Sequence, residues 1–193
     1  MPEKIENPTR EQAWALLAEF NSSDSLLKHA LAVEGVMRHI AAKYGESEDK
    51  WGIVGLLHDL DYEKFPEQHC AKEAEILRER GWPEEYVRAV VTHGWGLRDY
   101  LHEEPLSSME KTLYAVDELT GFVTACALVR PSKSVLDLEL SSVKKKWKQK
   151  SFAAGVNREV IEKGVVMLGV NLDDLIVDVI DGMRKVAPQI GLG

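Results

Sequence analysis

The stretch GLLHDLDYEKFPEQH, residues 55–69, sets a histidine and an aspartate side by side at the end of an apolar run. Burying His58 beside Asp59 is costly unless another group pairs with them. His29, His93 and Asp117 also have mainly apolar neighbours at helical spacing. A shared divalent cation is the economical partner, because imidazoles and carboxylates are ordinary ligands of first-row metals. The residue types therefore predict a metal centre.

Each of these residues alone also fits a structural role. A histidine on an apolar face is more often a hydrogen-bonded core residue than a ligand, and Asp117 faces solvent if the register of its stripe is different. Gly121, one turn after Asp117, leaves space beside that carboxylate. The metal interpretation therefore depends on separate helices that bring these side chains together.

The elements that must bring these side chains together are helices, because the apolar residues recur mainly with period 3.6 and no convincing run of period 2 occurs. Thr9 with Gln12, and Ser107 with Glu110, have the spacing of capping boxes. We expect helices over about 10–20, 25–44, 48–60, 66–80, 84–93, 107–129, 157–168 and 172–186, with a loop at 94–105 and a polar, basic segment at 132–155. The pattern predicts an all-α, single-domain helical bundle spanning residues 1–193.

Composition narrows the function classes. The chain has 193 residues, of which 45% are hydrophobic, enough for a core without disulfides or structural zinc. A net charge of −8 argues against binding to a nucleic-acid polymer or to an anionic membrane. Cys70 and Cys126 lack CxxC spacing, and we interpret both as packing residues. No signal region or membrane-length apolar run is present, so we expect a cytoplasmic protein.

The order His29, His58-Asp59, Asp117 on predicted helices resembles the HD-domain superfamily of metal-dependent phosphohydrolases. In that family the four corresponding residues ligate one metal. A small bacterial, six-ligand branch holds two metals with two further histidines, whose places are occupied here by His69 and His93. The resemblance implies that Asp59 bridges the ions and positions a hydroxide. It covers about residues 24–130, the HD-domain core, and leaves 131–193 as a basic segment and helices that pack on this core.

The resemblance implies hydrolysis of a phosphomonoester, phosphoanhydride or phosphodiester bond in a small, nucleotide-like substrate by a metal-activated hydroxide. The cofactor would be one or two divalent transition metal ions, Fe, Mn, Ni, Co or Zn, with Mg also compatible. The chain lacks the lysine of the HD-x-Gly-Lys motif and the GYP motif of cyclic-di-nucleotide phosphodiesterases. Met109-Glu110-Lys111 and Tyr114-Ala115-Val116-Asp117 are similar to motifs of small HD enzymes that split dinucleoside tetraphosphates.

Substrate contacts are expected from an aromatic residue after His93 and from cations after the last ligand helix. The candidates are Trp95, Arg130, Lys133, Lys146 and Lys150. For most of the basic run KKKWKQK, residues 144–150, a solvated helix face is the simpler interpretation.

Two other functions share the pattern. Some HD-fold proteins with six such ligands are mixed-valent di-iron oxygenases, which use O₂ to cleave carbon–carbon or carbon–phosphorus bonds. The chain also fits a non-catalytic helical module with a structural or regulatory metal. The pattern makes no prediction of the oligomeric state.

Overall fold

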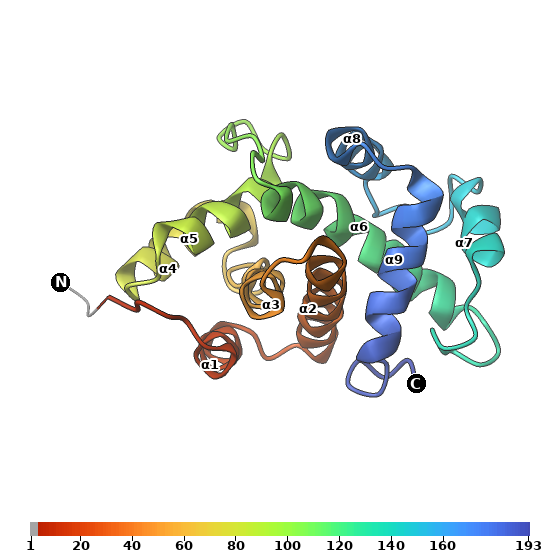
Figure 1. Ribbon diagram of the computed structural model, residues 1–193, viewed down its shortest axis with the longest axis horizontal. Helices are drawn as coiled ribbons and strands as arrows, with labels where there is room; N and C mark the ends of the chain where they lie inside the picture. Colours follow the sequence, from red (N-terminus) through yellow and green to blue (C-terminus); the bar gives the residue numbers. More distant parts are fainter. Residues whose placement is uncertain (1–3) are drawn as a thin grey trace.

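The computed structural model describes residues 4–193, and all its regular elements are helical (Figure 1). No strand occurs in this part of the chain, which confirms the predicted all-α fold. Residues 1–3, with which the predicted domain begins, lie outside the described residues. The helices are α1 (Arg10–Phe20), α2 (Asp24–Tyr44), α3 (Glu48–Leu57), η1 (Pro66–Gln68), α4 (Ala71–Glu79), α5 (Glu84–Val91), η2 (Thr92–Gly94), α6 (Ser108–Leu128), α7 (Leu140–Trp147), α8 (Arg158–Leu168) and α9 (Leu172–Lys185).

Helix ends follow the local chemistry of the sequence. Both predicted capping boxes form, with reciprocal hydrogen bonds between Thr9 and Gln12 before α1 and between Ser107 and Glu110 before α6. Gly45 ends α2 in the left-handed conformation at φ 72°, which glycine adopts without strain. The ends of the two long helices, α2 and α6, are thus specified by the sequence.

The two long helices form the centre of the molecule, where α2 packs against α3, α6 and α9 (Figure 1). The predicted apolar stripe of α2 faces the core, and Val33, Val36 and Met37 are fully buried. A Cβ atom on Gly182 of α9 would lie 2.6 Å from Cα of Val36, so these two backbones meet only because the side chain is absent. Helix α8 packs on α6, and the chain forms one compact helical unit.

Three predicted segments differ from the structure. The helix expected over 48–60 ends at Leu57, and the chain continues in turns through Lys64. The helix expected over 66–80 is broken, because the short η1 is followed by Cys70 at φ 66°, a left-handed conformation that cannot continue a helix. The basic segment at 132–155 contains α7, an additional helix.

None of the helices within residues 4–193 combines the length and apolar character needed to cross a bilayer.

Candidate metal centre

The six predicted ligands lie on separate parts of the fold. Their donor atoms gather into two adjacent groups, with Asp59 between them. Helix α2 carries His29 and α6 carries Asp117, whereas the other four residues lie at helix ends or in turns. His58 is the C-cap of α3 and Asp59 follows it, His69 follows η1, and His93 lies within η2. Helix ends and turns leave these side chains free to face the central helices.

A first group of donor atoms forms around the carboxylate of Asp117. Its Oδ1 lies 2.9 Å from Nε2 of His29 and 3.2 Å from Nε2 of His58. The two histidine Nε2 atoms are themselves 3.2 Å apart. Asp59 adds Oδ2, which lies 3.4 Å from Nε2 of His58 and 3.9 Å from Nε2 of His29. These four residues offer nitrogen and oxygen atoms to one position.

A second group lies on the other side of Asp59. The Nε2 atoms of His69 and His93 are 3.2 Å apart. Oδ1 of Asp59 lies 3.5 Å from Nε2 of His69 and 4.0 Å from Nε2 of His93. The two oxygens of Asp59 therefore face one donor group each.

Hydrogen bonds fix the orientation of three of the imidazole rings. Nδ1 of His58 donates to the carbonyl oxygen of Gly55 at 2.8 Å, and Nδ1 of His93 donates to that of Val90. Nδ1 of His69 donates to Oδ1 of Asp61 at 2.7 Å. Because each Nδ1 acts as a donor, the lone pair of each neutral ring lies on Nε2 and points toward the centre.

The charge state of the centre suits a cation. Burial alone would raise the pKa of Asp117, but His58 and His29 outweigh burial and hold it well below its usual value. Burial would lower the pKa of His58, yet Asp59 and Asp117 raise it well above 6.5. The same carboxylates that attract a proton to His58 would attract a metal ion. Neutral imidazoles and ionised carboxylates are the donor types that divalent first-row metals take.

His93 is held in its neutral form. Burial, with repulsion from His69 and His58, lowers its pKa to about 4. An unprotonated imidazole is the form that binds metal, so His93 needs to lose no proton near neutral pH.

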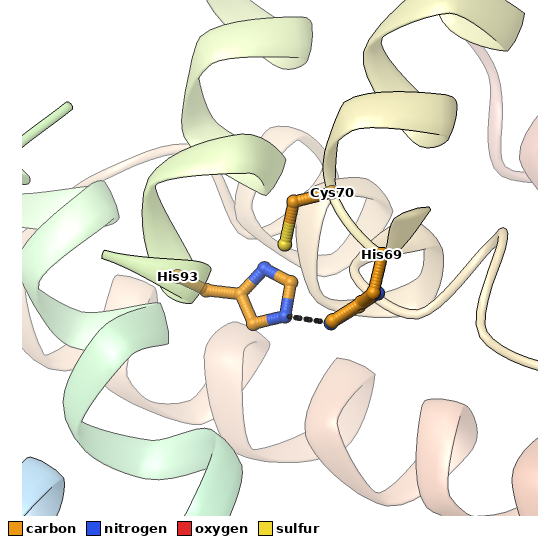
Figure 2. Close-up of side chains that lie close together, drawn as sticks. All are labelled: His69, Cys70 and His93. Carbon is orange, nitrogen blue, oxygen red and sulfur yellow. Dashed lines mark hydrogen bonds between the residues drawn. The ribbon is translucent and has the colours of Figure 1, made fainter. Parts of the chain in front are cut away.

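Cys70 lies beside the second group, within 4.8 Å of donor atoms of His69 and His93. Figure 2 shows its sulfur on the Nδ1 side of the His93 ring, away from the Nε2 atom that faces His69. Burial raises the pKa of the Cys70 thiol far above its usual value, and a thiol must lose its proton to ligate a metal. Its position fits the packing role that we expected.

The centre opens into a cleft of about 410 Å³, on which the His29, Asp59 and Asp117 side chains are 22%, 17% and 19% exposed. Besides five of the predicted ligands, all but His58, the cleft is lined by Tyr62, Leu97, Arg98, Glu118, Gly121 and Gly155. Arg98 is the one cationic side chain among the lining residues, and sequence analysis missed it because the loop around it has no periodicity. Asp61 was also missed, although its place two residues after Asp59 was a usable signal.

The predicted substrate contacts lie elsewhere. Trp95 packs on Tyr114 with a ring separation of 5.7 Å, and Lys163 lies 3.3 Å above the Trp95 ring. Arg130 pairs with Asp137 at 2.9 Å, and Lys146 lies 4.7 Å from the ring centre of Phe152. Lys133 and Lys150 are exposed.

None of Trp95, Arg130, Lys133, Lys146 and Lys150 is among the residues that line the cleft. Helix α7, which carries Lys146, lies at the opposite end of the molecule from α4 and α5 (Figure 1). A contact of these five residues with substrate stays a prediction, and Arg98 is nearer to the centre.

Comparison with protein families gives one match. The sequence model of the HD domain matches residues 26–121, a stretch that contains all six predicted ligands. Comparison with curated proteins and with solved structures found no significant match.

Proposed function

Since residues 26–121 form an HD domain, we propose that this protein is a metal-dependent phosphohydrolase of the six-ligand, two-metal branch. Its substrate would be a small phosphorylated molecule, with a phosphomonoester, phosphoanhydride or phosphodiester bond. Nucleotides are the first class to test, because motifs around Asp117 resemble those of enzymes that split dinucleoside tetraphosphates.

The observation that carries the proposal is the position of the Asp59 carboxylate between two donor groups. His29, His58 and Asp117 would hold one ion with Oδ2 of Asp59, and His69 and His93 would hold the other with Oδ1. When bound, divalent ions supply a water of lowered pKa and positive charge for the oxygens of a phosphoryl group. Both donor groups contain the imidazole nitrogens and carboxylate oxygens that divalent first-row metals take.

The chain's own residues would orient the substrate. Arg98 lies at the rim of the cleft, where its planar guanidinium would donate to phosphoryl oxygens. Asp61 would hold the His69 ring in place through the hydrogen bond to Nδ1. The buried faces of His58 and His93 would keep bulk water from the inner side of the centre.

The test is a substrate screen on protein loaded separately with Mn²⁺, Fe²⁺, Co²⁺, Ni²⁺, Zn²⁺ and Mg²⁺. The panel holds phosphomonoesters, phosphodiesters and dinucleoside polyphosphates, and the readouts are product release and bound metal per chain. We expect turnover of at least one class and loss of metal and turnover in His58→Ala. His39→Ala is the matched control, because His39 lies on α2 near Asp178 and outside the centre.

Two results would contradict the proposal. Metal-loaded protein that acts on no phosphate compound, with His58→Ala keeping its full metal content, would remove it. An electron paramagnetic resonance signal of coupled Fe(II) and Fe(III) that changes with an organic substrate would assign the centre to the di-iron oxygenases instead.

A further inference from the structure

A second cavity adjoins the metal cleft, and none of the phosphoryl contacts proposed above lies in it. It has a volume of about 280 Å³ and lies between α2, α6 and the C-terminal segment 190–192. We call it the Leu192 cavity. Its lining residues are Asp24, Ser25, Lys28, His29, Ala32, Gly121, Thr124, Leu128, Ile190, Gly191 and Leu192.

The Leu192 cavity and the cleft meet beside the metal centre. His29 and Gly121 line both spaces. A Cβ atom on Gly121 would find no heavy atom within 4 Å, so the junction between the spaces is open. Gly121 lies one turn after Asp117 on α6, which places this opening next to a predicted ligand. A molecule at the centre can therefore extend into the cavity.

The wall formed by the C-terminal segment is held in place by hydrogen bonds. The carbonyl oxygen of Leu192 accepts from the backbone N–H of Val135 at 2.9 Å and from Oγ of Ser134 at 3.0 Å. The N–H of Leu192 donates to the carbonyl oxygen of Ala187 at 2.9 Å. Leu192 itself is buried, so this wall is part of the folded core. The cavity is a preformed space.

The residues that line the Leu192 cavity favour an uncharged ligand. Aliphatic side chains come from Ala32, Leu128, Ile190 and Leu192. The ammonium of Lys28 is paired with Asp24 at 2.7 Å, so its charge is already balanced. The hydroxyl of Ser25 already shares a hydrogen bond with that of Ser23 at 2.9 Å, so the hydroxyl of Thr124 is the group that can hydrogen-bond to a ligand.

The lining contains no aromatic ring other than the imidazole of His29. Sites that bind nucleobases commonly stack them on aromatic side chains or on Arg, so this cavity is poorly suited to a base. Its volume lies just below the range of roughly 300–1,000 Å³ that is usual for drug-sized ligands. Both features favour a compact, mainly aliphatic group.

We propose that the Leu192 cavity binds the organic half of the substrate, and that this half is a compact, uncharged aliphatic alcohol esterified to a single phosphoryl group. The inference rests on the proposed function and narrows its substrate class. A single phosphoryl group is indicated because Arg98 is the one cation that lines the cleft. Hydrolysis adds water across the P–O bond, so that the water oxygen joins phosphorus and the alcohol leaves with a proton. The neutral alcohol matches the cavity.

The test measures the binding of n-alkylphosphonates, whose C–P bond resists hydrolysis, by titration calorimetry on Mn²⁺-loaded protein. The probes are inorganic phosphate and the methyl, ethyl, propyl and butyl phosphonates. Each buried methylene group is expected to tighten binding about fourfold. Affinity should therefore rise by roughly 60-fold from methyl- to butylphosphonate.

Two variants test whether the rise of affinity with alkyl chain length comes from the Leu192 cavity. Thr124 lines the Leu192 cavity but not the cleft, so the Phe side chain of Thr124→Phe would fill the cavity and leave the cleft unchanged. In this variant butylphosphonate should bind no tighter than methylphosphonate. Leu128→Ser removes an aliphatic wall at a side chain that is 50% exposed, so folding is retained and the gain with chain length should shrink. Leu136→Ser is the matched control, because Leu136 is 53% exposed and lies outside the cavity.

The outcomes separate the two proposals. If inorganic phosphate binds but affinity does not change with alkyl length, the cavity assignment is wrong and the phosphohydrolase proposal stands. Tighter binding of deoxyadenosine 5′-monophosphate than of butylphosphonate, unchanged in Thr124→Phe and Leu128→Ser, would also overturn the assignment, because it would place a nucleoside elsewhere. If inorganic phosphate itself does not bind, both proposals fail.

Discussion

Nδ1 of His69 donates a hydrogen bond to Oδ1 of Asp61 over 2.7 Å, and both side chains are buried. The second oxygen of Asp61 accepts the backbone N–H of Glu73 at 2.8 Å, which anchors the carboxylate to the start of α4. The sequence HDLD thus places one aspartate at the centre and a second one behind a histidine of the second donor group.

Asp61→Asn tests this positioning role. An amide can still accept from Nδ1 but carries no charge, and loss of such a partner weakens metal affinity by about 10–100-fold. We expect the ion held by His69 and His93 to be lost first, while the ion at His29, His58 and Asp117 is retained. Metal content per chain during titration with a chelator measures this.

Asp49→Asn is the control for Asp61→Asn, since Asp49 is exposed in the first turn of α3. Equal loss of both ions in Asp61→Asn, or no loss of either, would contradict the positioning role.

Removal of metal should destabilise the folded protein. A ligand that binds only the folded state, present at 100 times its dissociation constant, stabilises it by about 2.7 kcal/mol. Without cations, the partly buried carboxylates of Asp59 and Asp117 also remain on either side of the His58 ring with no metal ion to balance their charge. Differential scanning calorimetry should show a lower Tm after chelation and recovery with Mn²⁺ but not with Na⁺. A Tm that does not respond would speak against the centre.

Glu73 makes stability depend on pH. Its carboxyl is fully buried, and burial together with the charge of Asp61 raises its pKa well above 4.5. A raised pKa in the folded state contributes stability below pH 4.5 that is lost as the pH rises through the folded-state pKa. Glu73→Gln cannot ionise, so it should be the more stable protein at pH 8, by about 1–3 kcal/mol.

Denaturant unfolding of wild type and Glu73→Gln from pH 5 to pH 8 measures this difference. The gap between the two proteins should widen as the pH rises. If the difference in unfolding free energy stays constant or narrows across this range, ionisation of Glu73 is not the cause of the pH dependence of stability.

Two glycines on long helices should respond oppositely to alanine. Gly182→Ala puts a methyl group 2.6 Å from Cα of Val36 and forces α9 away from α2, which should cost about 1–3 kcal/mol of unfolding free energy. Gly121→Ala meets no atom within 4 Å and should add about 0.5–1 kcal/mol, because alanine favours the helix. Equal effects of the two substitutions in denaturant unfolding would rule out the close approach of α9 and α2.

Helical periodicity predicted the long elements well because their apolar stripes and caps are local features. The faces of His29 and Asp117 could be inferred in this way, since both lie within long helices. The course of residues 58–70 could not, because the left-handed Cys70 and the turns after His58 depend on tertiary contacts. The role of Asp61 follows from those turns and was therefore missed.

Cations near the centre were also hard to predict. The basic run near α7 drew attention by its charge, but charge alone does not tell where a helix lies relative to a cleft. Arg98 stands alone in a loop, where no periodic pattern marks the side that it faces. Loop positions such as this one become visible only after the helices on either side have been placed.

The most direct test of the account is anomalous diffraction from crystals of the Mn²⁺-loaded protein, with data collected on both sides of the manganese absorption edge. We predict two anomalous peaks on opposite sides of the Asp59 carboxylate, one among His29, His58 and Asp117 and one between His69 and His93. A protein with no peak there, or with its only peak at Cys70, would contradict the two-metal centre.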